Sequence, residues 1–330
     1  MKIPEFLIVL LLSSSATALG QEYRFGKDPF AHTFSIVARD ARTGEMAVGV
    51  QSHWFSVGTL VPWGKSGVGV VATQSFVNPA YGPEGLDLME KGKTADQALE
   101  ILLLEDEGRA FRQVAFLDQH GNTAVHTGKK CVEVAADYAE QNFSVQANMM
   151  LNDQVIPAMR EAFKKHTDLP LAERVLRVLE AAQSVGGDIR GKQSAALIVV
   201  GPEKVANSWE DKRIDLRVDD HENPIQELGR LLKVARAYQY MNRGDVAMEE
   251  GNVETALEQY GEAMKLFPEN LEMQYWTAVA MVNSGQLEEA LPIFRSIFEE
   301  DDNWREMTRR LPRAGLLHVS QAELEQIINL

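Results

Sequence analysis

The sequence has a single cysteine, Cys131, among its 330 residues. No disulfide can therefore form within the chain, and the fold must depend on its hydrophobic core for stability. A lone cysteine can be a catalytic nucleophile, but the surrounding T-G-K-K-C-V-E-V has the pattern of a strand. A cysteine in such a run is more often a small buried apolar side chain, so we do not expect Cys131 to be catalytic.

Basic residues are scarce relative to acidic ones. Lysine and arginine together number 33 against 48 aspartates and glutamates, which gives a formal net charge of −15 at pH 7. Phosphate groups would be repelled, so nucleic acid and anionic lipid are unfavourable partners. The histidines at 53, 120, 126 and 166 also lack the close spacing of metal ligands. We therefore expect no metal and no cofactor.

The apolar run near the N-terminus is too short to span a bilayer, which takes about 20 residues. It covers residues 6–12, follows Lys2, and precedes small residues at Ala18 and Gly20. This order predicts a cleaved secretory signal peptide over residues 1–20, followed by a leader segment at 21–32. The protein would then be exported, to the periplasm or outside the cell. An uncleaved terminal helix is the alternative.

Residues 33–220 have the pattern of one domain in which strands and helices are interspersed. Strands are expected at Thr33–Arg39, Met46–Ser52, 67–75, 113–117, Thr123–Thr127, 143–150 and 193–200. Helices are expected at 86–104 (with Thr94 as a cap), 153–165 and 170–184, and a rigid loop at 78–85. Hairpins with short turns, such as the one at Gly44, favour a layered α+β sandwich over a doubly wound parallel sheet.

The last third of the chain contains an internal repeat. Residues 251–260 (GNVETALEQY) recur as residues 285–294 (GQLEEALPIF), with an offset of 34 residues. That offset is the period of the tetratricopeptide repeat. Small residues and a helix-ending proline also occur where the repeat needs them, at Gly244, Ala278 and Pro268.

We therefore predict an all-α helical-repeat domain at residues 224–330. Two repeats seldom cover their own apolar faces, so residues 224–239 and 311–330 are expected to act as caps, or the first domain as a neighbour. A protein or cell-wall partner could bind through these repeats.

Thr33 stands at the head of a predicted strand, in F-A-H-T-F-S-I-V-A-R-D. Threonine is common in strands simply because it is β-branched. An N-terminal threonine can instead be a nucleophile, because its own α-amine accepts the proton of its hydroxyl. Signal cleavage after residue 20 would leave residues 21–32 attached to Thr33. A second cut is then needed, for example by attack of the Thr33 hydroxyl on the His32 carbonyl.

Several longer stretches of the sequence resemble one known family. They are T-F-S-I-V-A-R-D, V-G-V-Q-S-H-W-F-S-V-G, G-V-G-V-V-A-T-Q-S-F-V-N-P, Y-G-P-E-G, V-Q-A-N-M-M and G-G-D-I-R-G-K-Q-S-A-A-L. Residues 32–200 resemble the domain of unknown function 1028 family, which is grouped with the N-terminal-nucleophile hydrolases. The resemblance implies a four-layer αββα sandwich and an amide-bond hydrolase. It does not identify the substrate. Many relatives begin Met-Thr, whereas this chain carries a leader before Thr33.

Candidate site residues surround the predicted position of Thr33. Asn148 could donate to an oxyanion or could be a strand-end turn residue, and Asp188 and Ser194 could orient the threonine amine and relay its proton. Asp188 could also pair with Arg190 to shape a loop after a helix, with no role in catalysis. The candidates for substrate binding are Gln51, Ser52, His53, Arg190 and Gln193.

Two functions from different classes remain open. The first is an exported amidohydrolase or peptidase that uses Thr33 on a small amide or peptide substrate. The second is a non-catalytic binding protein on the same sandwich, with the repeats recruiting a partner. A free threonine at the mature N-terminus would separate them.

Overall fold

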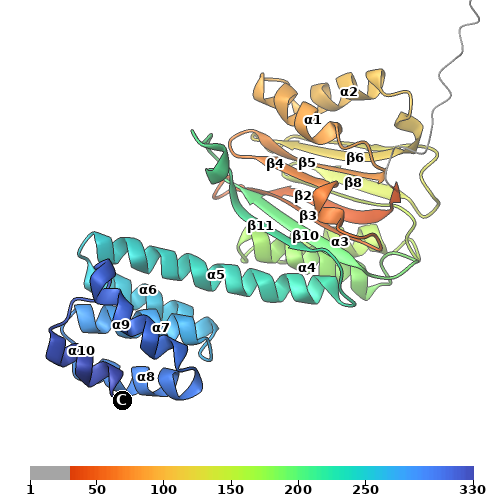
Figure 1. Cartoon of the computed structure of the whole chain (residues 1–330). Coiled ribbons are helices and arrows are strands. Elements are labelled where there is room, and N and C mark those ends of the chain that lie inside the picture. The colour runs from red at the N-terminus through yellow and green to blue at the C-terminus, as the bar shows by residue number, and fades with distance from the viewer. Residues whose placement is uncertain (1–29) are drawn as a thin grey trace, which may run out of the picture.

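The computed structural model describes residues 30–330, and the predicted signal peptide and most of the predicted leader lie outside this range. Residues 30–218 contain two antiparallel sheets that lie face to face (Figure 1). The larger sheet has six strands in the order β11 (Lys212–Val218), β10 (Ser194–Val200), β3 (Met46–Ser52), β2 (Thr33–Arg39), β9 (Phe143–Ala147) and β8 (Ala136–Glu140). The predicted bounds of β2 and β3 are confirmed, and Gly44 in the turn between them has a φ of +72°.

The smaller sheet has five strands. They are β1 (Phe30–Ala31), β4 (Pro62–Lys65), β5 (Gly69–Phe76), β6 (Arg112–Asp118) and β7 (Thr123–Thr127). β4 pairs with residues 69–72 of β5, and β1 pairs with Ser75 and Phe76 further along the same strand. β1 and β4 thus both pair with β5, at different places along it.

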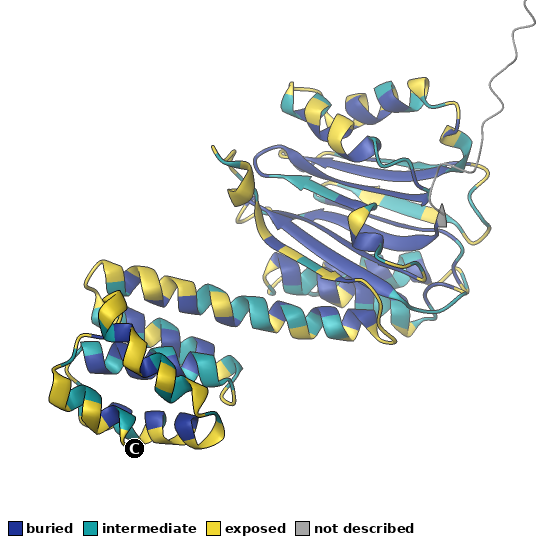
Figure 2. Cartoon of the chain, in the orientation of Figure 1, coloured by how far each residue is buried: buried dark blue, intermediate teal, exposed yellow. Residues whose placement is uncertain are grey.

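Three apolar layers hold the two sheets and their helices together. Valines and alanines such as Val48, Val70 and Ala115 fill the space between the sheets. α1 (Tyr81–Glu90) and α2 (Ala95–Glu105) pack on the outer face of the smaller sheet. α3 (Val155–Lys165) and α4 (Leu171–Ser184) pack on the outer face of the larger one. The strands in the middle of each sheet, such as β2, β3, β5, β6 and β10, are accordingly almost wholly buried, whereas the edge strands β8 and β11 and the helices carry exposed residues (Figure 2).

The structure corrects the expected loop at 78–85 and the single helix at 86–104. α1 already begins at Tyr81, and Gly92, with a φ of +91°, interrupts the chain between α1 and α2. A Cβ on Gly82 would come within 2.3 Å of the Trp63 ring, so this glycine permits close packing of a helix. Thr94 caps α2 through a capping box, as predicted.

Four strands were missed, and one expected strand is absent. The missed strands are β1, β4, β8 and β11, although the K-R-I-D-L-R-V of β11 alternates apolar and polar residues. Cys131 lies in a loop, where its thiol donates to the carbonyl of Arg112 at 3.3 Å. Its surroundings are half-buried, and burial raises the pKa of the Cys131 thiol, which disfavours the nucleophilic thiolate.

The C-terminal part of the chain is all-helical, as predicted. Its helices are α5 (Pro224–Glu249), α6 (Val253–Leu266), α7 (Leu271–Asn283), α8 (Leu287–Glu300), α9 (Asn303–Ala314) and α10 (Gln321–Ile328). Gly244 allows α5 to approach α6 closely, because a Cβ there would lie 2.4 Å from the Tyr260 ring. The equivalents 34 residues later, Ala278 and Phe294, are buried in the next core. No helix among the described residues is long and apolar enough to cross a membrane.

α5 belongs to both parts of the molecule. Ile225, Leu228 and Leu232 complete the core beneath the larger sheet, whereas Ala237 and Met241 pack among the repeat helices. An ion pair of 2.7 Å between Arg236 and Glu173 joins α5 to α4. Residues 224–239, expected as a cap of the repeats, thus also cover the sheet domain (Figure 1).

The packing of α5 predicts where the chain can be shortened. A chain ending at His221 loses Ile225, Leu228 and Leu232, each of whose burial contributes about 1.5–3 kcal/mol. A chain ending at Gln239 keeps all three. We expect the shorter chain to be less stable by about 4 kcal/mol or more, measured by urea unfolding. Equal midpoints for the two chains would show that the first half of α5 adds nothing to the sheet domain.

Candidate functional site

Four polar residues form a row across the larger sheet. Thr33 on β2 lies opposite Ser52 on β3, and Ser52 lies opposite Ser194 on β10. Asn148, just after β9, donates its backbone N–H to the Thr33 carbonyl at 3.1 Å. All four are fully buried. Because alternate residues of a strand share a face, Thr33, Ser52 and Ser194 share the face that packs against the smaller sheet.

The chain crosses from one sheet to the other immediately before Thr33. Ala31 pairs with Ser75 of the smaller sheet, whereas Thr33 pairs with Ser52 of the larger one. His32 spans the gap between them and has no exposed surface. The peptide bond between His32 and Thr33 is therefore enclosed at one end of the inter-sheet space.

Two side chains donate hydrogen bonds to the carbonyl of that peptide bond. The Ser52 hydroxyl lies 2.5 Å from the His32 carbonyl oxygen, and Nη2 of Arg190 lies 2.8 Å from it. One donor is neutral and the other is charged, and charge-assisted hydrogen bonds are the stronger kind. This pair of donors would stabilise negative charge that develops on the oxygen.

Asp188 holds Arg190 in this position. Its carboxylate accepts from Nε of Arg190 at 3.1 Å, from Nη2 at 2.7 Å and from the Arg190 backbone at 2.9 Å. It also accepts from the backbone N–H of His53 at 3.3 Å. The Asp188 side chain is completely buried, whereas Arg190 is 27% exposed. The expected Asp188–Arg190 pair is present, and it aims Arg190 at His32.

The side-chain amide of Asn148 contacts the His32 ring. Its Oδ1 lies 2.6 Å from Nδ1 of His32, and its Nδ2 donates to Oε1 of Gln113 at 2.9 Å. The predicted role of Asn148 as a donor to an oxyanion finds no matching contact on the His32 carbonyl. The same amide lies 3.5 Å from the Thr33 carbonyl, which also accepts from Gln74 at 3.1 Å.

Three buried glutamines between the sheets were not predicted as part of the site. Gln74 and Gln113 are joined by a 2.7 Å hydrogen bond, and Gln146 donates to Ser35 at 3.2 Å. All three side chains lie in strands and have no exposed surface. A glutamine within a buried strand is the sequence signal that could have found them, because a buried amide needs hydrogen-bonding partners.

The remaining predicted site residues point elsewhere. Gln51 lies on the opposite face of β3 from Ser52, toward the layer of α4, and is fully buried. The Ser194 hydroxyl is bound to the Trp54 carbonyl and to the backbone N–H of Val57, so it fixes a loop. The side chain of His53 is exposed, and that of Gln193 donates to Asp220 at 3.1 Å.

The environment of Thr33 and His32 sets their hydrogen bonding and protonation. The Thr33 hydroxyl donates to the Ala31 carbonyl at 2.8 Å. Burial lowers the pKa of the His32 imidazole, and the nearby Arg190 charge lowers it further, against opposing effects of Asn148 and Asp188. His32 is therefore neutral in the folded protein at pH 7.

Loops around the row carry large apolar side chains that face solvent. Backbone hydrogen bonds join these loops, from Leu151 to Gly187 at 2.9 Å and from Ile189 to Met149 at 3.1 Å. The exposed side chains on them are Phe55, Val134, Leu151 and Ile189, with exposed fractions between 43% and 63%.

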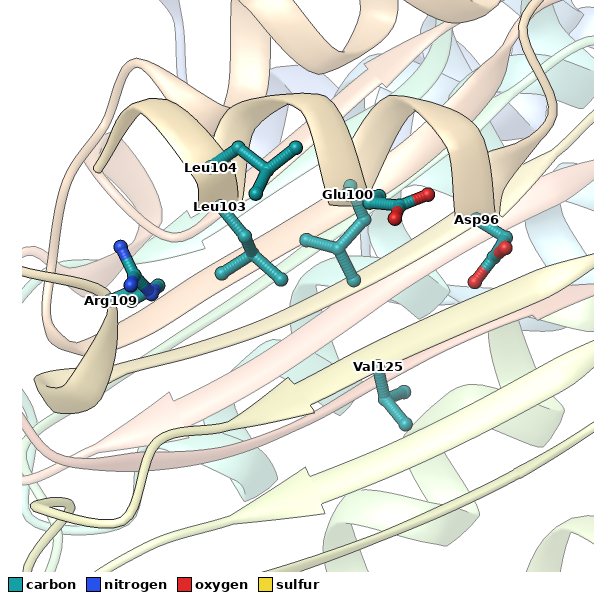
Figure 3. Close-up of a pocket in the computed structure, with 7 residues that line it drawn as sticks. Asp96, Glu100, Leu103, Leu104, Arg109 and Val125 are labelled. Carbon is teal, nitrogen blue, oxygen red and sulfur yellow. The ribbon is translucent and has the colours of Figure 1, made fainter. Parts of the chain in front are cut away.

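A separate pocket of about 450 Å³ lies between α2 and β7. Figure 3 shows Leu103, Leu104 and Glu100 of α2 above Val125, with Arg109 at one end and Asp96 at the other. This pocket is on the outer face of the smaller sheet, and none of the predicted site residues lines it. Among residues 30–330 no group of three or more His, Cys, Asp or Glu is arranged to hold a metal ion.

Comparison with known proteins matches the sheet domain and the helical repeats to two different families. A family model described as a family of unknown function, DUF1028, matches residues 33–228. The chain belongs to the DUF1028 family. A tetratricopeptide-repeat model matches residues 247–310. The match to DUF1028 thus begins at Thr33 and extends into the first turns of α5.

One solved relative has the same family assignment. The crystal structure of protein SPO2555 from Silicibacter pomeroyi, described as a DUF1028 protein, is 31% identical to this chain with a TM-score of 0.56. The similarity covers 62% of this chain and 89% of that one. No curated protein matches the sequence.

The ion pair between Arg190 and the buried carboxylate of Asp188 predicts the effect of Asp188→Asn. The new amide offers one acceptor instead of two, so Arg190 loses part of its partner. We expect the free energy of unfolding to fall by about 1–3 kcal/mol, measured by urea unfolding. Glu140→Gln, which breaks the exposed pair with Lys164, is the control and should hardly change the midpoint. Equal effects of the two substitutions would contradict a stabilising contribution of the Asp188–Arg190 pair.

The lowered pKa of His32 predicts a pH dependence of the stability of the DUF1028 domain. Below the ordinary pKa of about 6.5 the unfolded chain binds a proton that folded His32 does not, so stability falls as the pH falls. The unfolding midpoint is compared between about pH 7.5 and about pH 5 for two proteins, one with His32 and one with His32→Gln. Both carry Thr33→Ala, which removes the hydroxyl expected to attack the His32 carbonyl. The loss should be smaller with His32→Gln, and an equal loss would refute the lowered pKa.

Proposed function

We propose that this protein is an amide-bond hydrolase whose nucleophile is Thr33, made available when the protein cuts its own chain between His32 and Thr33. The observation that carries the proposal is the pair of donors on the His32 carbonyl, Ser52 and Arg190. A strand residue with no function would not need an arginine held by a buried carboxylate and aimed at the carbonyl before it.

The self-cleavage would proceed by attack of the Thr33 hydroxyl oxygen on the His32 carbonyl carbon. A carbon–oxygen bond forms, the bond from that carbon to the Thr33 nitrogen breaks, and the hydroxyl proton passes to that nitrogen. Ser52 and Arg190 stabilise the negative charge on the carbonyl oxygen while four groups surround the carbon. Water then hydrolyses the resulting ester, which leaves a carboxylate on His32 and restores the hydroxyl of Thr33.

The freed Thr33 has both groups that a second reaction needs. Its α-amine has an ordinary pKa near 8, so near neutral pH its neutral fraction can accept the hydroxyl proton when a substrate carbonyl is attacked. The substrate carbonyl would occupy the position that the His32 carbonyl holds now. Asp188 acts in this scheme as a positioning residue, because it holds Arg190 and does not contact the reacting atoms.

The architecture supports this assignment. Two sheets face to face between two helical layers have the layer order of the N-terminal-nucleophile hydrolases, the superfamily implied by the sequence resemblance. In the same proposal residues 1–20 direct export, and the helical repeats bind a protein partner. Tetratricopeptide-like repeats suggest protein–protein interaction.

A binding protein without catalysis is the second candidate. It is favoured by the burial of Ala31, His32 and Thr33, which fits a leader that stays in place. Under this proposal Thr33 remains within the chain and never acquires a free amine. The two candidates therefore differ in the mass of the purified protein.

The proposed function predicts the outcome of four substitutions. Thr33→Ala should keep the full chain, whereas Thr33→Ser keeps a hydroxyl and should still be cut. Ser52→Ala and Arg190→Gln each remove one donor from the His32 carbonyl and should slow cleavage by about 100-fold or more. Intact-mass spectrometry over time measures the fraction that begins at residue 33.

Ser284→Ala is the control for these variants, because that hydroxyl bonds only to Met281 and Gln286 at the end of α7, far from Thr33 in the repeat helices. It should be cut at the wild-type rate. A wild-type protein whose mass shows residues 30–32 still attached, with the mass of Thr33→Ala likewise uncut, would overturn the nucleophile assignment.

A further inference from the structure

The contacts of the leader describe the substrate of the same site. We propose that the protein binds peptides in an extended conformation and prefers histidine as the residue whose carbonyl is attacked, with Asn148 as the residue that recognises the histidine ring. This inference rests on the proposed function, because it treats residues 30–32 as the first substrate.

The backbone before Thr33 lies as a short strand on the edge of β5. Phe30 pairs with Phe76, and Ala31 pairs with Ser75, in antiparallel register. β4 pairs with residues 69–72 of the same strand, so it leaves the stretch at 75–76 to β1. Once the leader departs, this stretch of β5 becomes an unpaired strand edge. An extended peptide can add to such an edge through main-chain hydrogen bonds.

The side chain of His32 fills an enclosed place between the sheets. Its ring lies edge-on to Phe76, with centroids 6.0 Å apart, and has no exposed surface. Its Nδ1 is 2.6 Å from Oδ1 of Asn148. A side chain at this position must therefore match both an aromatic wall and a polar atom.

The surrounding glutamine fixes which end of the Asn148 amide faces the ring. The Gln113 amide nitrogen donates to the Ala147 carbonyl at 3.0 Å and to the Thr127 hydroxyl at 2.9 Å. Oε1 of Gln113 is therefore an acceptor, and it receives Nδ2 of Asn148. Oδ1 of Asn148 then faces His32 as an acceptor, so Nδ1 of the imidazole carries the hydrogen.

An acceptor at this point discriminates between side chains. Leucine has a similar size but would leave Oδ1 of Asn148 buried without a donor, which is unfavourable. Aspartate and glutamate would place a second acceptor against it. Histidine supplies a donor and a flat ring for Phe76, so we expect a preference of at least about tenfold over leucine.

The test uses the chain that begins at Thr33, which is the processed form, with its unfolding midpoint checked against that of the full chain. Its affinity for the tripeptides Phe-Ala-His and Phe-Ala-Leu, each with a free carboxylate, is measured by isothermal titration. The carboxylate places an oxygen where Ser52 and Arg190 now bind the His32 carbonyl. The histidine peptide should bind at least about tenfold more tightly.

Variants separate recognition of the ring from binding of the carboxylate. Asn148→Ala should reduce the preference to within about threefold, whereas Arg190→Gln should weaken both peptides by a similar factor. Leu104→Ala is the control, because this exposed residue lines the distant pocket of Figure 3 and should change neither affinity. In the full chain, His32→Leu should slow self-cleavage by about tenfold.

The same protein is assayed for hydrolysis of the amide Phe-Ala-His-Gly, so the two proposals can fail separately. Hydrolysis without selective binding of Phe-Ala-His would overturn the histidine preference and leave the hydrolase standing. Selective binding without hydrolysis would support the recognition by Asn148 and overturn the proposed function. Neither binding nor hydrolysis, in a chain that is folded, would overturn both.

Discussion

The arrangement around Thr33 depends on a guanidinium that is held in place by a buried carboxylate. Asp188 contributes a charge with no exposure to water, and such a charge is unfavourable unless it is paired and fully hydrogen-bonded. Arg190 and the His53 backbone supply those partners. Because Asp188 is fixed, Arg190 has little freedom, and its Nη2 donates both to Asp188 and to the His32 carbonyl. The position of one peptide bond thus follows from the need to neutralise one buried charge.

The pairing of the strands determines which polar side chains lie next to Thr33. A residue row across antiparallel strands brings Thr33, Ser52 and Ser194 together although they are far apart in sequence. Polar groups in that row are enclosed, so each must find a partner inside the protein. Ser194 finds it in the loop at Trp54, whereas Ser52 finds it in the His32 carbonyl. Neighbouring members of one row therefore have different roles, and the partner of each hydroxyl decides which role it has.

Sequence patterns predicted the parts of the fold that depend on local periodicity. The bounds of β2 and β3 follow from two β-rich runs separated by a turn at Gly44. α1 was missed because glycine and proline usually indicate a loop, whereas here Gly82 gives a helix room to pack on Trp63. That distinction depends on a contact between residues distant in sequence, which no local pattern contains.

The site residues, like the fold, could be predicted from the sequence only in part. Thr33, Ser52, Asn148 and Arg190 do converge, but Gln51 could not accompany Ser52, since neighbouring strand residues face opposite sides. Gln74 and Gln113 were missed because their function depends on facing the other sheet across the core. The pairing of strands, and hence the partners of buried amides, is a property of the whole fold.

Gln193 shows how the two parts of the chain are connected at this site. Its backbone N–H donates to the Ser52 carbonyl at 3.1 Å, and its own carbonyl accepts from His221 at 2.8 Å. Lys192 binds Asn223, the residue before α5, at 2.5 Å. The loop that carries Asp188 and Arg190 is thus bound to β3 on one side and to the start of α5 on the other. Since α5 continues without interruption into the repeat helices, the helix that begins the repeat region also fixes the loop that positions Arg190.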